Sequence, residues 1–241
     1  MESLILNILK TLLITAILAT NAYARQVKIA VIDTGYTKPI NFDSVNLCDS
    51  GHFDATTDKE VVGLDSNFKN IQNHGTHVAH IIDDKLRVLG KNKYCLVIFK
   101  IYGEGNNVVE SSIKALKRIK NSDIRYVNYS TAGEGYYTEE YQAIKDVLNR
   151  GVKIFAAAGN RSQSLDLIKI YPAMYDSRIF VVGNGMSNQE RFFASNYGSY
   201  VKYWVNGMNI LAGGYVKSGT SQAAAIFSSR YIYDNIIMYG Q

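Results

Sequence analysis

Three polar residues that lie far apart in the sequence have the side chains that serine-based acyl transfer requires. Asp33 follows an apolar stretch, His74 precedes another, and Ser221 comes after Gly219-Thr220, just before a run of small residues. A serine hydroxyl is a weak nucleophile at neutral pH and needs a base to accept its proton. A histidine can be that base, and a carboxylate can hold its imidazole in the required tautomer. The sequence therefore offers a nucleophile, a base and an orienting acid.

Acyl transfer also needs hydrogen-bond donors for the oxyanion that forms on the attacked carbonyl. Asn160 directly follows an apolar stretch and a glycine, so its side-chain amide could be one donor. The backbone N–H of Ser221 could be another, because the first N–H groups of a helix have no partner within the helix. Each residue also has a plainer interpretation, since Asn160 could simply form a turn and Ser221 could be an ordinary helix start.

Two other kinds of catalytic site use residues of these types. Asp33-Thr34-Gly35 also fits the aspartate loop of aspartic proteases, but those sites need two such loops and this chain contains one. His74, His77 and His80 are spaced as zinc ligands could be. Six residues are far from a whole number of helical turns, however, so the first and third of these side chains would point apart. We therefore expect His77 to be a structural histidine.

The elements that must position these residues alternate between strand and helix, which predicts an α/β fold with a parallel sheet and helices on both faces. In such sheets the functional groups gather at the carboxyl ends of the strands, where Asp33, Ser130 and Asn160 are expected. The predicted strands cover residues 27–32, 95–101, 124–130, 152–158 and 179–182, with a short one at 45–48; the predicted helices begin at His74, near Val109, near Tyr141 and near Thr220.

Four segments together resemble the motifs of the subtilisin-like serine peptidases, the subtilases. They are 31–35 around the aspartate, 74–79 around the histidine, 156–160 ending at the asparagine and 219–223 around the serine, and they occur in the order of that family. The resemblance covers roughly residues 27 to 237. It implies a three-layer α/β/α sandwich with a mainly parallel central sheet, and serine endopeptidase activity on peptide or protein substrates.

The resemblance also implies a role for each residue. His74 would be the base, Asp33 its orienting carboxylate, Ser221 the nucleophile and Asn160 an oxyanion donor. The segment 127–131 is similar to the family's strand that pairs with substrate backbone, which makes Ser130 a substrate-binding residue. Ala157 and Gly159 would lie across the primary specificity pocket, which Ile170 is expected to narrow.

The chain also departs from the family pattern. The loop after the histidine helix lacks the family's calcium-binding insertion, so no cofactor is expected and a need for calcium is in doubt. His80 and Ala225 stand where the family often has Gly and Pro. Two alternatives stay open: a non-catalytic binding or scaffold protein on a degraded protease fold, and an esterase that uses the same triad.

Composition and the first residues bear on location and partners. The chain has 241 residues with 26 basic and 21 acidic side chains, but no dense basic run tied to aromatic residues, so no nucleic-acid partner is expected. Residues 12–19 are apolar and Ala22-Tyr23-Ala24 fits a signal-peptide cleavage site. We expect a signal peptide at 1–24 and a secreted or periplasmic, monomeric peptidase domain at 25–241. Membrane contact is expected only if this segment stays uncleaved as an anchor.

Export changes the meaning of the two cysteines, because an oxidising compartment permits disulfides. Cys48 and Cys95 are the only cysteines in the sequence and fit no metal-binding spacing, so we expect them to pair, with two buried thiols as the alternative. The segment 27–32 reads as a core strand directly after the cleavage site. We therefore expect the chain from Arg25 to fold without an intramolecular prosegment.

Overall fold

The computed structural model describes residues 26–60 and 73–239. The strands of its main sheet are β1 (Val27–Asp33), β2 (Phe53–Asp54), β3 (Lys59–Glu60), β4 (Tyr94–Lys100), β5 (Tyr126–Tyr129), β6 (Lys153–Ala157), β7 (Phe180–Asn184) and β8 (Tyr203–Val205). The helices are α2 (His74–Leu86), α3 (Val108–Lys120), α4 (Thr138–Asn149) and α5 (Thr220–Tyr239), with a 3-10 turn at Arg87–Leu89; β9 (Ile210–Ala212) and β10 (Tyr215–Lys217) form a separate hairpin.

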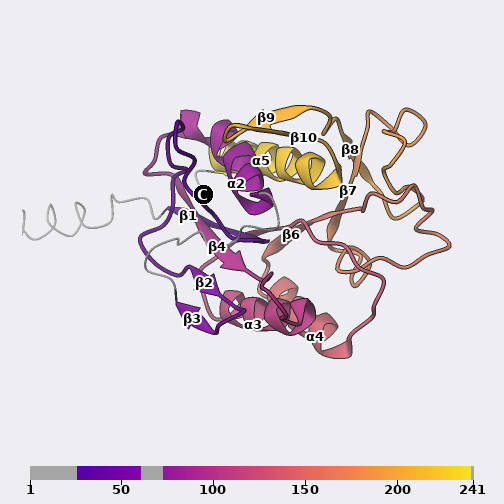
Figure 1. The fold of residues 1–241 in the computed structure, drawn as a ribbon, viewed down its shortest axis with the longest axis horizontal. Helices are drawn as coiled ribbons and strands as arrows, with labels where there is room; N and C mark the ends of the chain where they lie inside the picture. Colours follow the sequence, from indigo (N-terminus) through magenta and orange to yellow (C-terminus); the bar gives the residue numbers. More distant parts are fainter. Residues whose placement is uncertain (1–25, 61–72, 240–241) are drawn as a thin grey trace, which may run out of the picture.

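The main sheet has the order β3-β2-β4-β1-β5-β6-β7-β8. Only the short β2–β3 pair is antiparallel among these described strands. Helices α2 and α5 cover one face, and α3 and α4 cover the other (Figure 1). The predicted three-layer α/β/α sandwich with a mainly parallel sheet is therefore confirmed.

The central strand β1 shows why the sheet is buried on both faces. Ile29 and Val31 pack with the core beneath α2 and α5, whereas Ala30 and Ile32 pack with the core beneath α3 and α4. Successive side chains of a strand point to opposite faces, so a strand between two helical layers must be apolar at every position. Burial on both faces therefore explains the run of apolar residues before Asp33.

The helices follow from ordinary local rules. Asn107 caps the start of helix α3: its side-chain oxygen accepts hydrogen bonds from the backbone N–H groups of Val109 and Glu110 at 3.0 and 3.3 Å. The basic residues in its last turn interact favourably with the negative end of the helix dipole. The turn after α4 contains Gly151 at φ 83°, a conformation that glycine adopts without steric cost. Helices α2 to α5 all lie where the sequence predicts them.

One predicted strand is wrong. Residues 45–48 do not form a strand, and only Leu47 makes an isolated bridge to Leu96 of β4. The apolar pattern there reflects burial of Val45 and Cys48 against the core rather than continuous pairing. Conversely, β2, β3, β8, β9 and β10 were not predicted, because strands of two or three residues are too short to show an alternating pattern.

The predicted signal segment 1–24 lies outside the described residues. Within the part of the chain that the structure describes, none of the helices has the length and apolar character that crossing a bilayer demands.

Cys48 and Cys95 form a disulfide, as predicted, with an S–S distance of 2.01 Å. Cys95 belongs to β4, next to β1 in the sheet, while Cys48 lies in the long connection between β1 and α2. The bond therefore ties this connection to the centre of the sheet.

Removal of this bond in a Cys48→Ser, Cys95→Ser variant should lower the free energy of unfolding by about 3–4 kcal/mol, because the unfolded chain regains the entropy of an open loop. Urea unfolding of both proteins measures the difference. Two thiols that alkylate freely in the native, non-reduced wild-type protein would show that the bond is not formed.

Candidate active site

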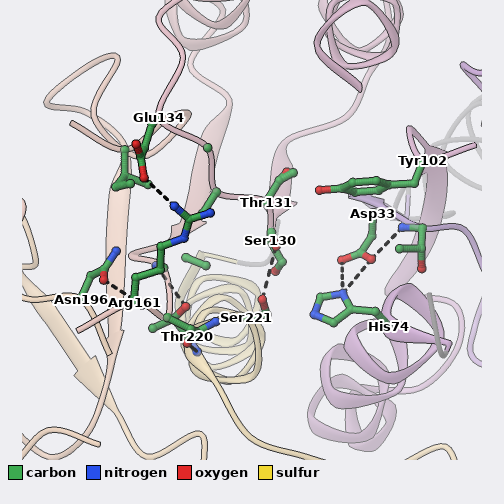
Figure 2. A pocket seen from close by; sticks show the side chains of 17 residues that line it. Asp33, His74, Tyr102, Ser130, Thr131, Glu134, Arg161, Asn196, Thr220 and Ser221 are labelled. Carbon is green, nitrogen blue, oxygen red and sulfur yellow. Dashed lines mark hydrogen bonds and ion pairs between the residues drawn. The ribbon is translucent and has the colours of Figure 1, made fainter. Parts of the chain in front are cut away.

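All seven residues that the sequence assigns to catalysis or substrate binding line one cleft of about 350 Å³. The cleft lies at the carboxyl ends of the strands, where β1, β5 and β6 meet the amino ends of α2 and α5. In Figure 2, Asp33 and His74 lie on one side of this cleft, and Ser221 and Ser130 lie on the other. The seven residues are Asp33, His74, Ser130, Ala157, Gly159, Asn160 and Ser221.

A hydrogen bond joins Asp33 to His74. The His74 Nδ1 atom lies 2.8 Å from Asp33 Oδ1 and 3.0 Å from Oδ2, and the carboxylate is 2% exposed. The backbone N–H of Thr34 also donates to Oδ1, at 2.7 Å. A carboxylate at this distance keeps the imidazole proton on Nδ1, which leaves Nε2 free to accept a proton. The pair therefore has the geometry of a base and its orienting acid.

The first turn of α2 is held directly against the loop that leaves β1. The Gly75 N–H donates to Thr34 Oγ1 at 2.9 Å, and Thr76 Oγ1 accepts from the Thr37 N–H at 2.9 Å. A Cβ at position 75 would lie 2.2 Å from the Gly35 carbonyl oxygen, so only glycine permits this approach. The helix start thus fixes His74 over Asp33.

The electrostatic environment of His74 differs from that of the other histidines. Burial alone would lower the pKa of the His74 imidazolium, but the charge and the hydrogen bond of Asp33 outweigh burial and raise it above 6.5. Burial lowers the pKa values of His52, His77 and His80, for which no comparable partner compensates. Of the four histidines, only His74 has a raised pKa.

Ser221 lies in the first turn of α5 and is 6% exposed. Its hydroxyl donates to the backbone carbonyl of Ser130, at the end of β5, with 3.3 Å between the oxygens. Figure 2 shows this bond running to Ser130 and not toward His74. The sequence predicted that Ser221 and His74 would share the cleft, but it did not predict this resting partner for the hydroxyl. The hydroxyl must leave this partner before His74 can accept its proton.

Asn160 and the start of α5 are bound to each other. The Asn160 Oδ1 atom accepts from the Thr220 N–H at 2.9 Å, while Thr220 Oγ1 accepts from the Gly159 N–H at 3.1 Å. Gly159 has φ 97°, and a Cβ there would lie 2.5 Å from Asn196 Nδ2, so glycine is required. With its oxygen engaged, the Asn160 amide has no bond from Nδ2 to any described residue and can donate to a ligand.

Residues of the loops after β5 and β6 also line the cleft. Ile170 lines the cleft and is 3% exposed, and its narrowing of the pocket stays a prediction. At the mouth, the Arg161 guanidinium reaches across to the Glu134 carboxylate at 2.5 Å (Figure 2). This ion pair links the loop after β6 to the loop after β5.

Asn196 holds the backbone of the loop after β6 by hydrogen bonds, although the sequence did not predict this role. Its Oδ1 accepts from the N–H groups of Arg161 and Gln163, both at 3.0 Å, and its Nδ2 donates to the Ala158 carbonyl at 2.8 Å. No pattern around Asn196 distinguishes it from an ordinary turn residue, so only the fold could identify it.

The other two histidines of the 74–80 series are structural. His77 Nε2 bonds the Ile210 carbonyl at 2.9 Å, and the His80 ring stacks against Tyr36 with 6.0 Å between centroids. Among the described residues, no three His, Cys, Asp or Glu side chains are grouped to hold a metal ion.

The family model described as the subtilase family, Peptidase_S8, matches residues 24–234. The chain belongs to the subtilase family. This subtilase is 28% identical over 178 residues to subtilisin DY of Bacillus licheniformis, covering 69% of this chain and 65% of that protein. It is 31% identical over 148 residues to alkaline protease 1 of Aspergillus flavus, covering 58% of this chain and 35% of that protein.

The subtilase thus spans 65% or less of the length of these two curated relatives. Among solved structures, a lanthipeptide protease has a TM-score of 0.72 and 17% sequence identity, covering 92% of this chain and 79% of the other. At that identity the likeness concerns the fold, which agrees with the α/β/α sandwich described above.

The raised pKa of His74 leads to a prediction that requires no turnover. In an NMR titration, one imidazole should titrate above pH 6.5 and the other three below. Asp33→Asn removes both causes that raise the His74 pKa and leaves burial, so the midpoint should move below 6.5. Because the raised pKa stabilises the fold at low pH, this stabilisation should be full below about pH 6.5 and lost as pH rises through the His74 pKa. An unchanged midpoint in Asp33→Asn would contradict the coupling.

Proposed function

We propose that this protein is a serine endopeptidase that cleaves peptide bonds through His74, Asp33 and Ser221, with Asn160 as an oxyanion donor. The observation that carries the proposal is the Asp33–His74 hydrogen bond at 2.8 Å, in a cleft that also contains Ser221 and Asn160. Membership of the subtilase family supports the same reaction. No cofactor enters the proposed mechanism.

The proposed reaction proceeds in two stages. Ser221 Oγ turns from the Ser130 carbonyl, gives its proton to His74 Nε2 and attacks the carbonyl carbon of the substrate. The Asn160 amide and the Ser221 N–H donate to the oxyanion, and His74 then protonates the leaving amine. Water, deprotonated by His74, hydrolyses the acyl-enzyme and restores the serine. Asp33 stays ionised and stabilises the imidazolium that forms in both stages.

A fluorophosphonate probe tests whether Ser221 is activated. Labelling should map to Ser221, be absent in Ser221→Ala and be nearly absent in His74→Ala, because the hydroxyl needs a base. Mass spectrometry of the labelled peptide identifies the site. Folded protein that does not react, or that reacts at another serine, would favour a non-catalytic scaffold.

Asn160→Ala serves as the companion variant. It should still react with the probe but cleave peptides about 10²–10³-fold more slowly, the usual effect of one lost oxyanion donor. A change of only a few-fold would remove Asn160 from this role. Parallel peptide and ester substrates separate a peptidase from an esterase that uses the same residues.

We further propose that the protein is exported by cleavage after Ala24. The Cys48–Cys95 disulfide supports an oxidising location. N-terminal sequencing of the protein recovered outside the cytoplasm should begin at Arg25. Full-length protein held in the membrane fraction would instead identify the first residues as an anchor.

A further inference from the structure

A second cavity, of about 360 Å³, adjoins the catalytic cleft. The two share Tyr102 and residues 131–134, which form a common wall. The remaining walls of the second cavity come from α3, α4, the end of β5 and Tyr171-Pro172. A peptide bound in the cleft would therefore lie beside this cavity.

A buried carboxylate lines the second cavity. Glu140 of α4 is 5% exposed, and three hydroxyl groups donate to it. Ser112 and Tyr129 donate to Oε1 at 2.6 and 2.8 Å, and Tyr175 donates to Oε2 at 2.8 Å. Burial, together with the Glu140 carboxylate, raises the pKa of both tyrosines, so their hydroxyls stay protonated and continue to donate.

These hydroxyls leave the negative charge of Glu140 without a cation. No Lys, Arg or His of the described residues forms an ion pair with it. A carboxylate has about four acceptor positions, and three are used here, so Oε2 retains room for one further donor. Burial makes an uncompensated charge costly, which favours any ligand that brings the opposite charge.

The walls of the cavity suit the same kind of ligand. Tyr102, Tyr129, Tyr137 and Tyr171 are among its lining residues, and the faces of aromatic rings attract cations. An anionic side chain would be repelled by Glu140, and an apolar side chain would cover the carboxylate without pairing with it. The long side chains of lysine and arginine have apolar stems for the rings and a charged end for the carboxylate.

We propose that this second cavity binds a lysine or arginine side chain of the peptide substrate, and that Glu140 is the residue that selects it. The inference rests on the proposed peptidase function and names its substrate class. A purely structural Glu140, which only ties α4 to its neighbours through the three hydroxyls, would affect stability but would not discriminate between charged and neutral side chains.

The test uses fluorogenic peptides that come in matched pairs. One peptide of each pair contains a single lysine, and the other contains norleucine, its uncharged counterpart, at the same position. The pairs cover each position from two to five residues on either side of one scissile bond. At one position the lysine peptide should have a kcat/KM at least about tenfold above that of the norleucine peptide, which corresponds to about 1.4 kcal/mol. In Glu140→Gln this ratio should fall to about one. Norleucine that is accepted as well as lysine at every position by the wild-type protein would overturn the proposal.

Glu139→Gln is the matched control, because Glu139 is the neighbouring residue of α4 and its side chain is exposed. The control variant should keep the wild-type ratio of kcat/KM between the lysine and norleucine peptides. Loss of this ratio in Glu139→Gln would also overturn the proposal. Binding of the same peptides to Ser221→Ala, measured by fluorescence polarisation, separates the proposed peptidase function from the proposed role of Glu140. If no peptide is cleaved, the peptidase function fails, whereas equal binding of lysine and norleucine peptides refutes the role of Glu140 alone.

Discussion

The close contact between the first turn of α2 and the loop leaving β1 is the constraint on which the site depends. The carboxylate of Asp33 stands at the end of a strand buried on both faces, so its position is fixed by the core. The absence of a side chain at Gly75 lets the helix backbone approach the Gly35 carbonyl. A single methyl group there would separate the helix from the loop, and the imidazole from the carboxylate. Packing thus determines the electrostatic state of His74.

A second set of hydrogen bonds fixes the other side of the cleft. The Asn160 and Thr220 side chains each accept a hydrogen bond from the opposite backbone, which connects the end of β6 to the start of α5. Strand β5 lies between β1 and β6 in the sheet, and the carbonyl of Ser130, just after β5, accepts the hydrogen bond of the Ser221 hydroxyl. The residues proposed for the reaction therefore sit on different elements, yet each is fixed by backbone that the core positions.

Much of the fold and of the candidate site could be predicted from the sequence, for identifiable reasons. The long apolar strands and amphipathic helices are buried in ways that leave a periodic pattern, and the four motifs place Asp33, His74, Asn160 and Ser221 at strand or helix ends. The features that the sequence did not predict have a common cause, because each depends on contacts between residues far apart in the chain. The single bridge at Leu47, the loop-organising Asn196 and the bond from Ser221 to Ser130 depend on segments brought together only by folding.

Glu140 illustrates the same limit, because a glutamate in the first turn of a helix suggests only a favourable interaction with the helix dipole. Its burial, and the tyrosines around it, become visible once α3, α4 and β5 are assembled.

The ion pair between Arg161 and Glu134 makes the mouth of the cleft sensitive to the surrounding medium. Its side chains are 67% and 51% exposed, so dissolved salt screens their attraction. The bond that connects the two rims therefore weakens as ionic strength rises, while the buried hydrogen bonds at the base of the cleft are screened much less.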